Sequence, residues 1–454
     1  MERKNIFYKL RAKSTSLLVI LSALVILMSS NIYSLPSYTR QTGLPCSSCH
    51  YTTYLQLTPF GRLFKLNGYT KTGIEQTYKS GGTKDNPYME VLKAVPISAR
   101  IQGSVTYLNN AVPGKANGVI EFPQQANVYL AGELAPKVGS YIQFTYSDQS
   151  GTFTFDNSDL RFATHTTLAS KDLLFGLTLN NCPTYQDVWN STPGWGFPYV
   201  NPGTAPTPMS STMLEGPLAG RVTGLGAYAL FNNLIFAEIT GYRSTPQAGV
   251  YPADSTSAST IKGVTPYWRI ALQHAWGGQY IEVGTYGLYT EAYLTGITGL
   301  TDKATDVAFD AQYENRIGEA SLIAHANFIH ETRTLDAIFA SSGAFSPSGN
   351  LNSFKLDCTY NFPIPIGITV GFFSITGSSD ALLYPSASVS GSQNNSPNSS
   401  GVRTQVSYAP WENIQLALQY TIYTQFNGGT NGYDGFGRNS ADNNALYFNT
   451  IITL

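Results

Sequence analysis

The chain has 454 residues and a formal net charge of −1, so its charge balance does not predict a nucleic-acid partner. Only 12% of the residues are charged, against roughly 25% in a typical soluble domain, whereas 13% are aromatic and 42 are glycine. The mean hydropathy of −0.11 excludes a bundle of transmembrane helices. Together these values favour a transmembrane β-barrel, whose strands alternate apolar and polar residues.

The N-terminus has the layout of a secretory signal peptide. Residues 1–13 are basic, residues 17–28 are almost wholly apolar, and a serine-rich stretch precedes Pro36. The apolar run is shorter than the roughly 20 residues of a membrane-spanning helix. We therefore expect residues 1–34 to be a signal peptide and the chain to be exported.

Residues 35–94 are predicted to form a small cytochrome segment. They contain Cys46-Ser47-Ser48-Cys49-His50, the attachment signature of a c-type haem. Two thiols at this spacing can form thioethers with the two vinyl groups of one macrocycle, and the next residue, His50, supplies the proximal imidazole to the iron. A redox dithiol and half of a zinc site are the alternatives, but no second pair of zinc ligands follows within the next hundred residues.

A short helix is predicted directly after this motif. Thr58 is suited to be its N-cap, Pro59 its first residue, and Gly68 its end. We expect an apolar stripe on this helix to cover one haem face: Phe60, Leu63, Phe64 and Leu66. A segment of about sixty residues is too small to bury a haem alone, so a further wall must come from elsewhere in the chain.

Residues 95–454 are predicted to form a porin-like barrel. Period-two alternation marks sixteen strands, at 96–108, 125–135, 138–147, 157–168, 171–180, 219–230, 233–242, 266–275, 278–289, 305–314, 317–331, 351–361, 366–376, 400–409, 412–425 and 443–453. Short turns, such as Asn315-Arg316 and Pro410-Trp411, alternate with long polar loops. Short turns on one side only are typical of outer-membrane barrels, in which they face the periplasm.

The fold class is therefore all-β, a 16-stranded outer-membrane barrel whose small N-terminal cytochrome segment lies on the periplasmic side or plugs the lumen. A soluble sandwich or propeller is the alternative. Sixteen strands are too many for one sandwich, and no blade-length repeat supports a propeller. Strand parity predicts that Asp159, Arg161 and His165 face the lumen, and that Leu160 and Phe162 face lipid.

The loop at about 181–218 is distinct in length and content. It is rich in proline and aromatic residues and contains Met209 and Met213. By analogy with general porins, it either folds into the barrel and packs on the haem segment or is an ordinary exposed loop.

With these stretches in view, the chain resembles the fused monohaem cytochrome–porin proteins of iron-oxidising bacteria, the outer-membrane iron oxidases. The resemblance lies in 40–50 (RQTGLPCSSCH), in 57–69 (LTPFGRLFKLNGY), and in 155–162, 183–189 and 194–198. It implies an outer-membrane location, one covalent haem c, extracellular Fe(II) as the electron donor, and a periplasmic carrier as the acceptor. That carrier would be a soluble c-type cytochrome or a copper protein.

The sequence leaves several assignments open. The preferred distal haem ligand is Met89, with Met209, Met213 and His165 as alternatives. Asp187 and Glu215 are either oxygen ligands for iron or solvated loop charges. Cys182 and Cys358 either pair in the oxidising compartment or stay separate. The alternative functions are a haem-plugged porin and the same conduit working outward, and a soluble cytochrome with a β-rich partner domain is the remaining alternative.

Overall fold

The computed structural model describes residues 36–51, 56–70, 77–79, 90–92, 95–183, 185, 187–192, 201–245 and 253–454. The predicted signal peptide and Met89 lie outside these residues. Within the described residues, no helix is both long enough and apolar enough to cross a membrane.

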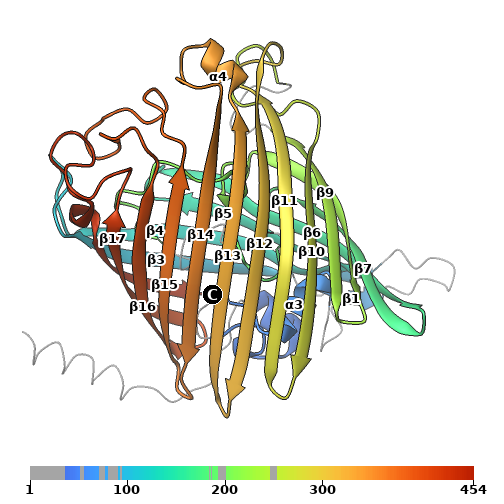
Figure 1. Cartoon of the computed structure of the whole chain (residues 1–454). Coiled ribbons are helices and arrows are strands. Elements are labelled where there is room, and N and C mark those ends of the chain that lie inside the picture. Colours follow the sequence, from blue (N-terminus) through green and yellow to red (C-terminus); the bar gives the residue numbers. More distant parts are fainter. Residues whose placement is uncertain are drawn as a thin grey trace, which may run out of the picture.

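Sixteen antiparallel strands close into one barrel (Figure 1). Each strand pairs with its neighbours in sequence, and the last strand pairs with the first, so that Ala445 lies opposite Leu108. The strands are β3 (Ile97–Leu108), β4 (Val119–Ala135), β5 (Val138–Ser147), β6 (Thr152–Leu168), β7 (Lys171–Asn180), β8 (Val222–Phe231), β9 (Ile235–Ser244), β10 (Thr265–Trp276), β11 (Gln279–Tyr293), β12 (Thr301–Ile317), β13 (Ala320–Thr334), β14 (Ser348–Asn361), β15 (Ile366–Gly377), β16 (Ser399–Trp411), β17 (Ile414–Gln425) and β18 (Ala445–Thr453).

All sixteen predicted strands are confirmed, but several bounds differ. β12 runs to Ile317, so the predicted turn at Asn315-Arg316 is wrong and the chain reverses at Gly318 instead. Gly318 has a φ of +62°, a conformation that glycine adopts without strain. The turn between β16 and β17 likewise lies at Glu412 and the next residue rather than at Pro410-Trp411.

The two faces of the barrel wall differ in polarity, as the parity of β6 predicts. Asp159 and Arg161 are buried and point inward, while Leu160 and Phe162 alternate with them on the outer face. Large apolar side chains stand on the outside of other strands too, for example Leu225, which is 65% exposed. An apolar outer band around a polar interior is the pattern of a barrel that contacts lipid.

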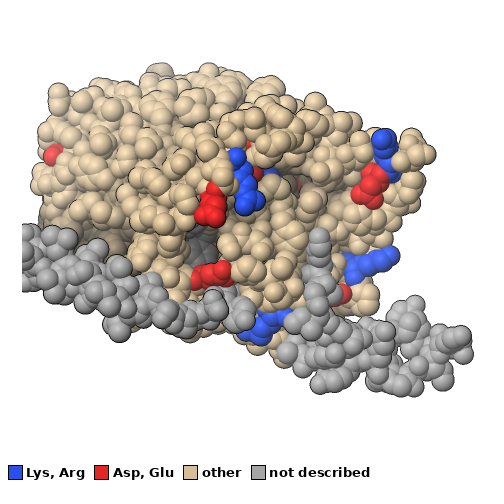
Figure 2. Space-filling model, turned by 90° about the horizontal axis from the view of Figure 1, so that it is seen from below, with Lys and Arg blue, Asp and Glu red and all other residues tan. Residues whose placement is uncertain are grey.

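The N-terminal segment lies inside the barrel at its short-turn end. Figure 1 shows α3 (Pro59–Leu66) within the lower part of the barrel, whereas α4 (Asp336–Ala340) lies among the long loops at the opposite end. The other small elements are α2 (Pro36–Thr42), η1 (Cys46–Ser48), the hairpin of β1 (Thr77–Lys79) and β2 (Glu90–Leu92), η2 (Met213–Glu215) and η3 (Ser440–Asn443). Seen from the short-turn end, the molecule shows few charged side chains (Figure 2).

The predicted helix is confirmed as α3. The Thr58 hydroxyl accepts a hydrogen bond from the amide of Gly61 at 3.1 Å, and Gly68 ends the helix with a φ of +66°. The expectation for its apolar stripe is wrong in part, because only Phe64 lines the pocket beside the cysteine motif. Leu66, with Leu63 beside it, packs against buried side chains of the barrel wall and of the loop after β7 instead.

Candidate functional site

The Cys46–His50 motif forms a tight loop. The main-chain amides of Cys49 and His50 donate hydrogen bonds to the carbonyl of Cys46, at 2.9 and 2.8 Å. A glutamate at the turn between β16 and β17 holds this loop from the barrel side, because the Cys46 amide donates to Glu412 Oε2 at 2.8 Å. The motif is thereby fixed to the short-turn end of the barrel.

Helix α3 packs directly against the motif. The Thr58 amide donates to the carbonyl of Cys49 at 2.9 Å, and the Thr58 hydroxyl donates to the carbonyl of Ser48 at 2.6 Å. At Gly61 a Cβ atom would lie only 2.2 Å from the Cys49 carbonyl oxygen. The approach of helix and loop therefore depends on glycine at this position.

The motif lines an open pocket, whose empty space, counted together with the solvent at its mouth, is about 1060 Å³. Its walls come from α2, the motif, α3, the barrel strands and the loop after β7. The lining residues are Tyr38, Thr39, Thr42, Leu44, Pro45, Cys46, Cys49, His50, Leu57, Gly61, Phe64, Lys65, Tyr69, Arg100, Tyr129, Tyr141, Tyr185, Asn190 and Thr453. The barrel thus supplies the further wall that the small segment was expected to need.

Two groups of aromatic rings contribute to the lining of this pocket. Tyr38 lies with its ring centroid 5.0 Å from that of Phe64 and 5.7 Å from that of Tyr69. Tyr141 stacks on Tyr185 with centroids 4.8 Å apart. Burial raises the pKa of Tyr38, Tyr69 and Tyr185 well above the ordinary value, so these phenols are neutral. Flat, neutral aromatic surfaces suit a large planar ligand.

The donor set of the pocket fits a c-type haem. Both cysteines and His50 line the same pocket, as covalent attachment and proximal ligation require. Burial raises the pKa of the Cys49 thiol to about 11, so this thiol is protonated at neutral pH. Across the described ranges no group of three or more His, Cys, Asp or Glu side chains could hold a metal ion, so the zinc alternative gains no support there.

The described part of the loop after β7 folds into the barrel and packs on the N-terminal segment, so the inward alternative is the one observed. The ammonium of Lys65 on α3 donates to the carbonyls of Tyr185 and Asp187. Trp189 is 3% exposed, and its indole N–H donates to the hydroxyl of Tyr280 at 2.7 Å. The loop therefore joins α3 to strand β11.

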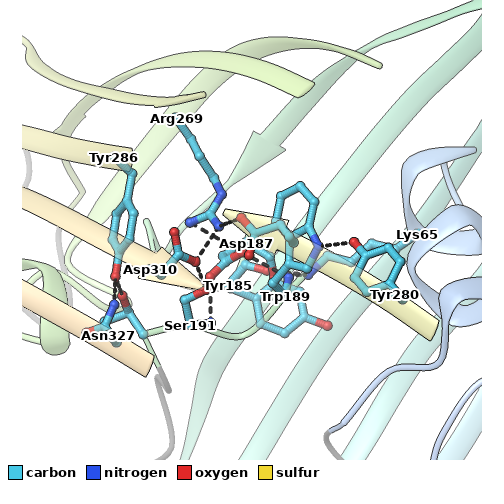
Figure 3. A network of polar contacts seen from close by, with 12 residues as sticks. Lys65, Tyr185, Asp187, Trp189, Ser191, Arg269, Tyr280, Tyr286, Asp310 and Asn327 are labelled. Atoms are coloured by element: carbon cyan, nitrogen blue, oxygen red, sulfur yellow. Dashed lines mark hydrogen bonds and ion pairs between the residues drawn. The ribbon is translucent and has the colours of Figure 1, made fainter. Parts of the chain in front are cut away.

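A buried arginine seats this loop on the barrel wall (Figure 3). Arg269 on β10 donates to Asp310 at 2.6 Å and to Glu282 at 3.0 Å, and lies 3.8 Å from Asp187 of the loop. The hydroxyl of Ser191, also in the loop, donates to Asp310. One guanidinium thus faces three buried carboxylates, so its single positive charge offsets only part of theirs.

A second arginine attaches α3 to β11 and β12, the strands that also carry Glu282 and Asp310. Arg62 is 3% exposed and forms an ion pair with Glu314 of β12 at 2.5 Å. Its guanidinium also lies 4.2 Å from the ring centroid of Tyr280. Together with the hydrogen bond from the Tyr228 hydroxyl to the carbonyl of Leu66, at 2.7 Å, these contacts fix the helix to three strands.

The described candidates for the distal haem ligand lie away from the pocket. Met209 and Met213 line a separate open pocket that shares no residue with the one beside the cysteines. His165 faces the segment as parity predicts, but its ring is hydrogen-bonded to Asn67 and Asp172 at 2.7 and 3.0 Å. Met89, the preferred candidate, lies outside the described residues.

Other candidate residues have structural partners. Asp187 is 3% exposed and accepts from the amides of Trp189 and Ser191. Burial opposes ionisation of Glu215, but its contact with Lys355, at 2.5 Å, keeps the pKa of Glu215 below its ordinary value. Asp187 and Glu215 are therefore not the solvated loop charges that one of the two alternatives predicted. Cys182 is buried and Cys358 is exposed, and no disulfide joins them.

Tyr185 belongs to the aromatic loop for which inward folding was one of the two alternatives. Sequence reasoning missed other residues of this site, namely Lys65, Arg100, Glu412 and the remaining four pocket tyrosines. The tyrosines had only a compositional signal, the 30 tyrosines of the chain. Helix α2 was also missed, although Pro36 at its start and Gly43 just past its end are typical helix boundary signals.

No protein-family model matches the chain, and no curated protein matches it. Among solved structures, it is similar to OprB of Pseudomonas putida (9% identity, 79% of this chain and 94% of that one, TM-score 0.48). It is also similar to OmpF of Salmonella typhi in complex with daunomycin (11%, 79% and 97%, TM-score 0.47) and to an anion-selective porin from Comamonas acidovorans (9%, 79% and 98%, TM-score 0.45). Similarity at this level assigns neither a family nor an activity.

Proposed function

We propose that the chain is an outer-membrane electron conduit with one covalent haem c at Cys46, Cys49 and His50. It takes one electron from Fe(II) outside the cell and passes it to a periplasmic carrier, a soluble c-type cytochrome or a copper protein. The apolar outer band and the single-sided short turns of the barrel support an outer-membrane location.

One observation carries the proposal: the cysteine motif lines an aromatic pocket that is walled by the barrel itself. When bound there, a haem supplies a reversible one-electron site whose potential depends on its axial ligands and burial. The chain's own residues hold the motif in place, through Glu412 and Thr58, and tyrosine rings contribute apolar surface to the pocket. Met89 stays our candidate for the distal ligand.

The reaction moves one electron and no atoms. Extracellular Fe(II) becomes Fe(III), and an oxidised periplasmic carrier becomes reduced. Because Fe(III) is nearly insoluble at neutral pH, oxidation outside keeps mineral out of the cell. The hydrocarbon core that the electron must pass is about 30 Å thick, and a site inside the lumen shortens that distance.

The test compares the wild-type protein with the Cys46→Ala/Cys49→Ala variant, both purified in detergent. We expect a pyridine haemochrome spectrum of one haem per wild-type chain and none in the variant. In anaerobic stopped-flow absorbance, Fe(II) should reduce the wild-type haem. A wild-type chain without haem would overturn the proposal, whereas haem that dithionite reduces and Fe(II) does not would remove iron as the donor.

A conduit that exports electrons to an extracellular acceptor would share every structural feature described above. A different measurement is therefore needed to distinguish it from an iron oxidase. A spectroelectrochemical titration should give a high midpoint potential for an iron oxidase. A low midpoint potential would favour electron export to an extracellular acceptor.

A further inference from the structure

The pocket beside the cysteine motif has an unequal charge balance. Two cationic side chains line it, Lys65 from α3 and Arg100 from β3, and its lining holds no aspartate or glutamate among the residues that the structure describes. The rest of the lining is mostly aromatic, aliphatic or neutral polar. Such a pocket complements a ligand with a broad apolar body and anionic groups.

Lys65 is held deep in this pocket. Lys65 is 6% exposed, and its ammonium lies 4.3 Å from the ring centroid of Tyr185. Its hydrogen bonds go to the main-chain carbonyls of Tyr185 and Asp187. Burial, with Arg161 nearby, lowers the pKa of Lys65 to about 8. A carboxylate in direct contact stabilises a buried ammonium more than a carbonyl does, and the hydrogen bonds of Lys65 go to carbonyls.

Arg100 lines the same pocket from the barrel wall. Its Nε donates to Asn127 Oδ1 at 3.0 Å, and its guanidinium lies 5.9 Å from the ring centroid of Tyr129. These contacts orient the guanidinium on the inner face of β3. An arginine so oriented is suited to bind a carboxylate through two parallel N–H groups.

We propose that Lys65 and Arg100 bind the two propionate carboxylates of the haem. The inference rests on the proposed function, because it assumes a haem at Cys46 and Cys49. A haem matches the pocket in shape and charge, since it combines one flat apolar macrocycle with two carboxylates. The two cations orient the macrocycle in the pocket and offset its negative charge, which raises the midpoint potential of the site.

The experiment uses the full-length protein in detergent, with haem labelled by ¹³C at the propionate carboxyls through the biosynthetic precursor 5-aminolevulinate. Four variants are compared with the wild type: Lys65→Met, Arg100→Met, Lys65→Arg and, as a control, Lys171→Met. Lys171 is an exposed lysine at the same end of the barrel. Redox-difference infrared spectra and midpoint potentials are measured at one pH and ionic strength.

We expect the labelled carboxylate bands to shift, and the midpoint potential to fall, in Lys65→Met and in Arg100→Met. Lys65→Arg should stay close to the wild type, and Lys171→Met should match it. Unchanged bands and potentials in both methionine variants would overturn this inference while leaving the haem in place. If Lys65→Met retains no haem, Arg100→Met and Lys65→Arg decide the question on the same two readouts.

Two further outcomes would overturn the assignment. Conversion of the Lys65→Met haem from low to high spin would show that Lys65 ligates the iron instead of a propionate. Absence of any haemochrome from the wild-type chain would overturn the proposed function itself, and this inference with it.

Discussion

At the scale of single residues, the approach of α3 to the cysteine loop leaves no room for a side chain at Gly61. In Gly61→Ala the new methyl group would meet the Cys49 carbonyl at 2.2 Å, and neither backbone can move easily. We expect overpacking to cost about 1–3 kcal/mol of stability and to reduce the haem bound per chain. The haemochrome-to-protein ratio and urea unfolding measure both effects.

The matched control is Gly349→Ala at the start of β14. An added Cβ there would come no closer than 3.6 Å to its neighbours, which is ordinary contact. Equal haem content in the two alanine variants would contradict the importance assigned to the Gly61 contact.

The residues of the motif were predictable because their chemistry is local: Cys46, Cys49 and His50 follow one another within five positions. Lys65 and Arg100 were not, because a pocket lining is a property of the tertiary structure. Asp187 shows the same limit, since nothing near it in sequence signals that Arg269 lies 3.8 Å away.

At the scale of elements, the attachment of the loop after β7 to Arg269 can be tested directly. Arg269→Met would leave Glu282 and Asp310 buried beside Asp187 without their shared cation. Losing one partner of a buried ion pair costs about 3–5 kcal/mol. We expect a lower urea midpoint and faster chymotrypsin cleavage in the loop, compared with Arg243→Met, which changes an exposed arginine.

The opposite outcome would contradict this role of Arg269. If Arg269→Met and Arg243→Met unfold at the same urea concentration and resist chymotrypsin equally, the arginine does not hold the loop. Trp189 and its hydrogen bond to Tyr280 would then be the contact to change next.

The elements themselves were largely predictable, because alternation of apolar and polar residues is a local signal that barrel strands carry one by one. The ends of the strands were less predictable. β4 begins at Val119, six residues before the predicted start, and β12 extends at both ends. A strand that is longer than the roughly 9–11 residues needed to cross the membrane has ends that lipid does not constrain, so they need not alternate.

At the scale of the whole molecule, the burial of Lys65 links stability to pH. Its pKa of about 8 in the folded chain lies below its ordinary value of 10.5, so the unfolded chain binds more protons between these pH values. The free energy of unfolding should therefore rise with pH across this window, by up to about 3 kcal/mol from this group.

The haem-free variant Cys46→Ala/Cys49→Ala is the protein in which to measure this slope, since no propionate is then present. Adding Lys65→Met to it should remove the rise between pH 8 and 10.5, while other titrating groups contribute equally to both proteins. Parallel stability curves for the pair would contradict the assignment of the slope to Lys65.

The filled lumen leads to a prediction about transport. Helix α3, fixed by Arg62 and Glu314, and the loop seated on Arg269 both lie within the barrel. In planar bilayers we expect the wild-type protein to conduct ions weakly, and Arg269→Met to conduct more. A large, stable wild-type conductance would favour the haem-plugged porin, with solutes passing beside the segment.

The link between Cys46 and Glu412 joins residues that lie 366 positions apart in the chain. Its consequence concerns the order of assembly. The chain is made from its N-terminus onward, so the Cys46 amide has no Glu412 to bind until most of the barrel sequence exists. The barrel is closed only when β18, which follows Glu412, pairs with β3. The cysteine loop therefore gains this support late, although both cysteines stay partly exposed at the short-turn end.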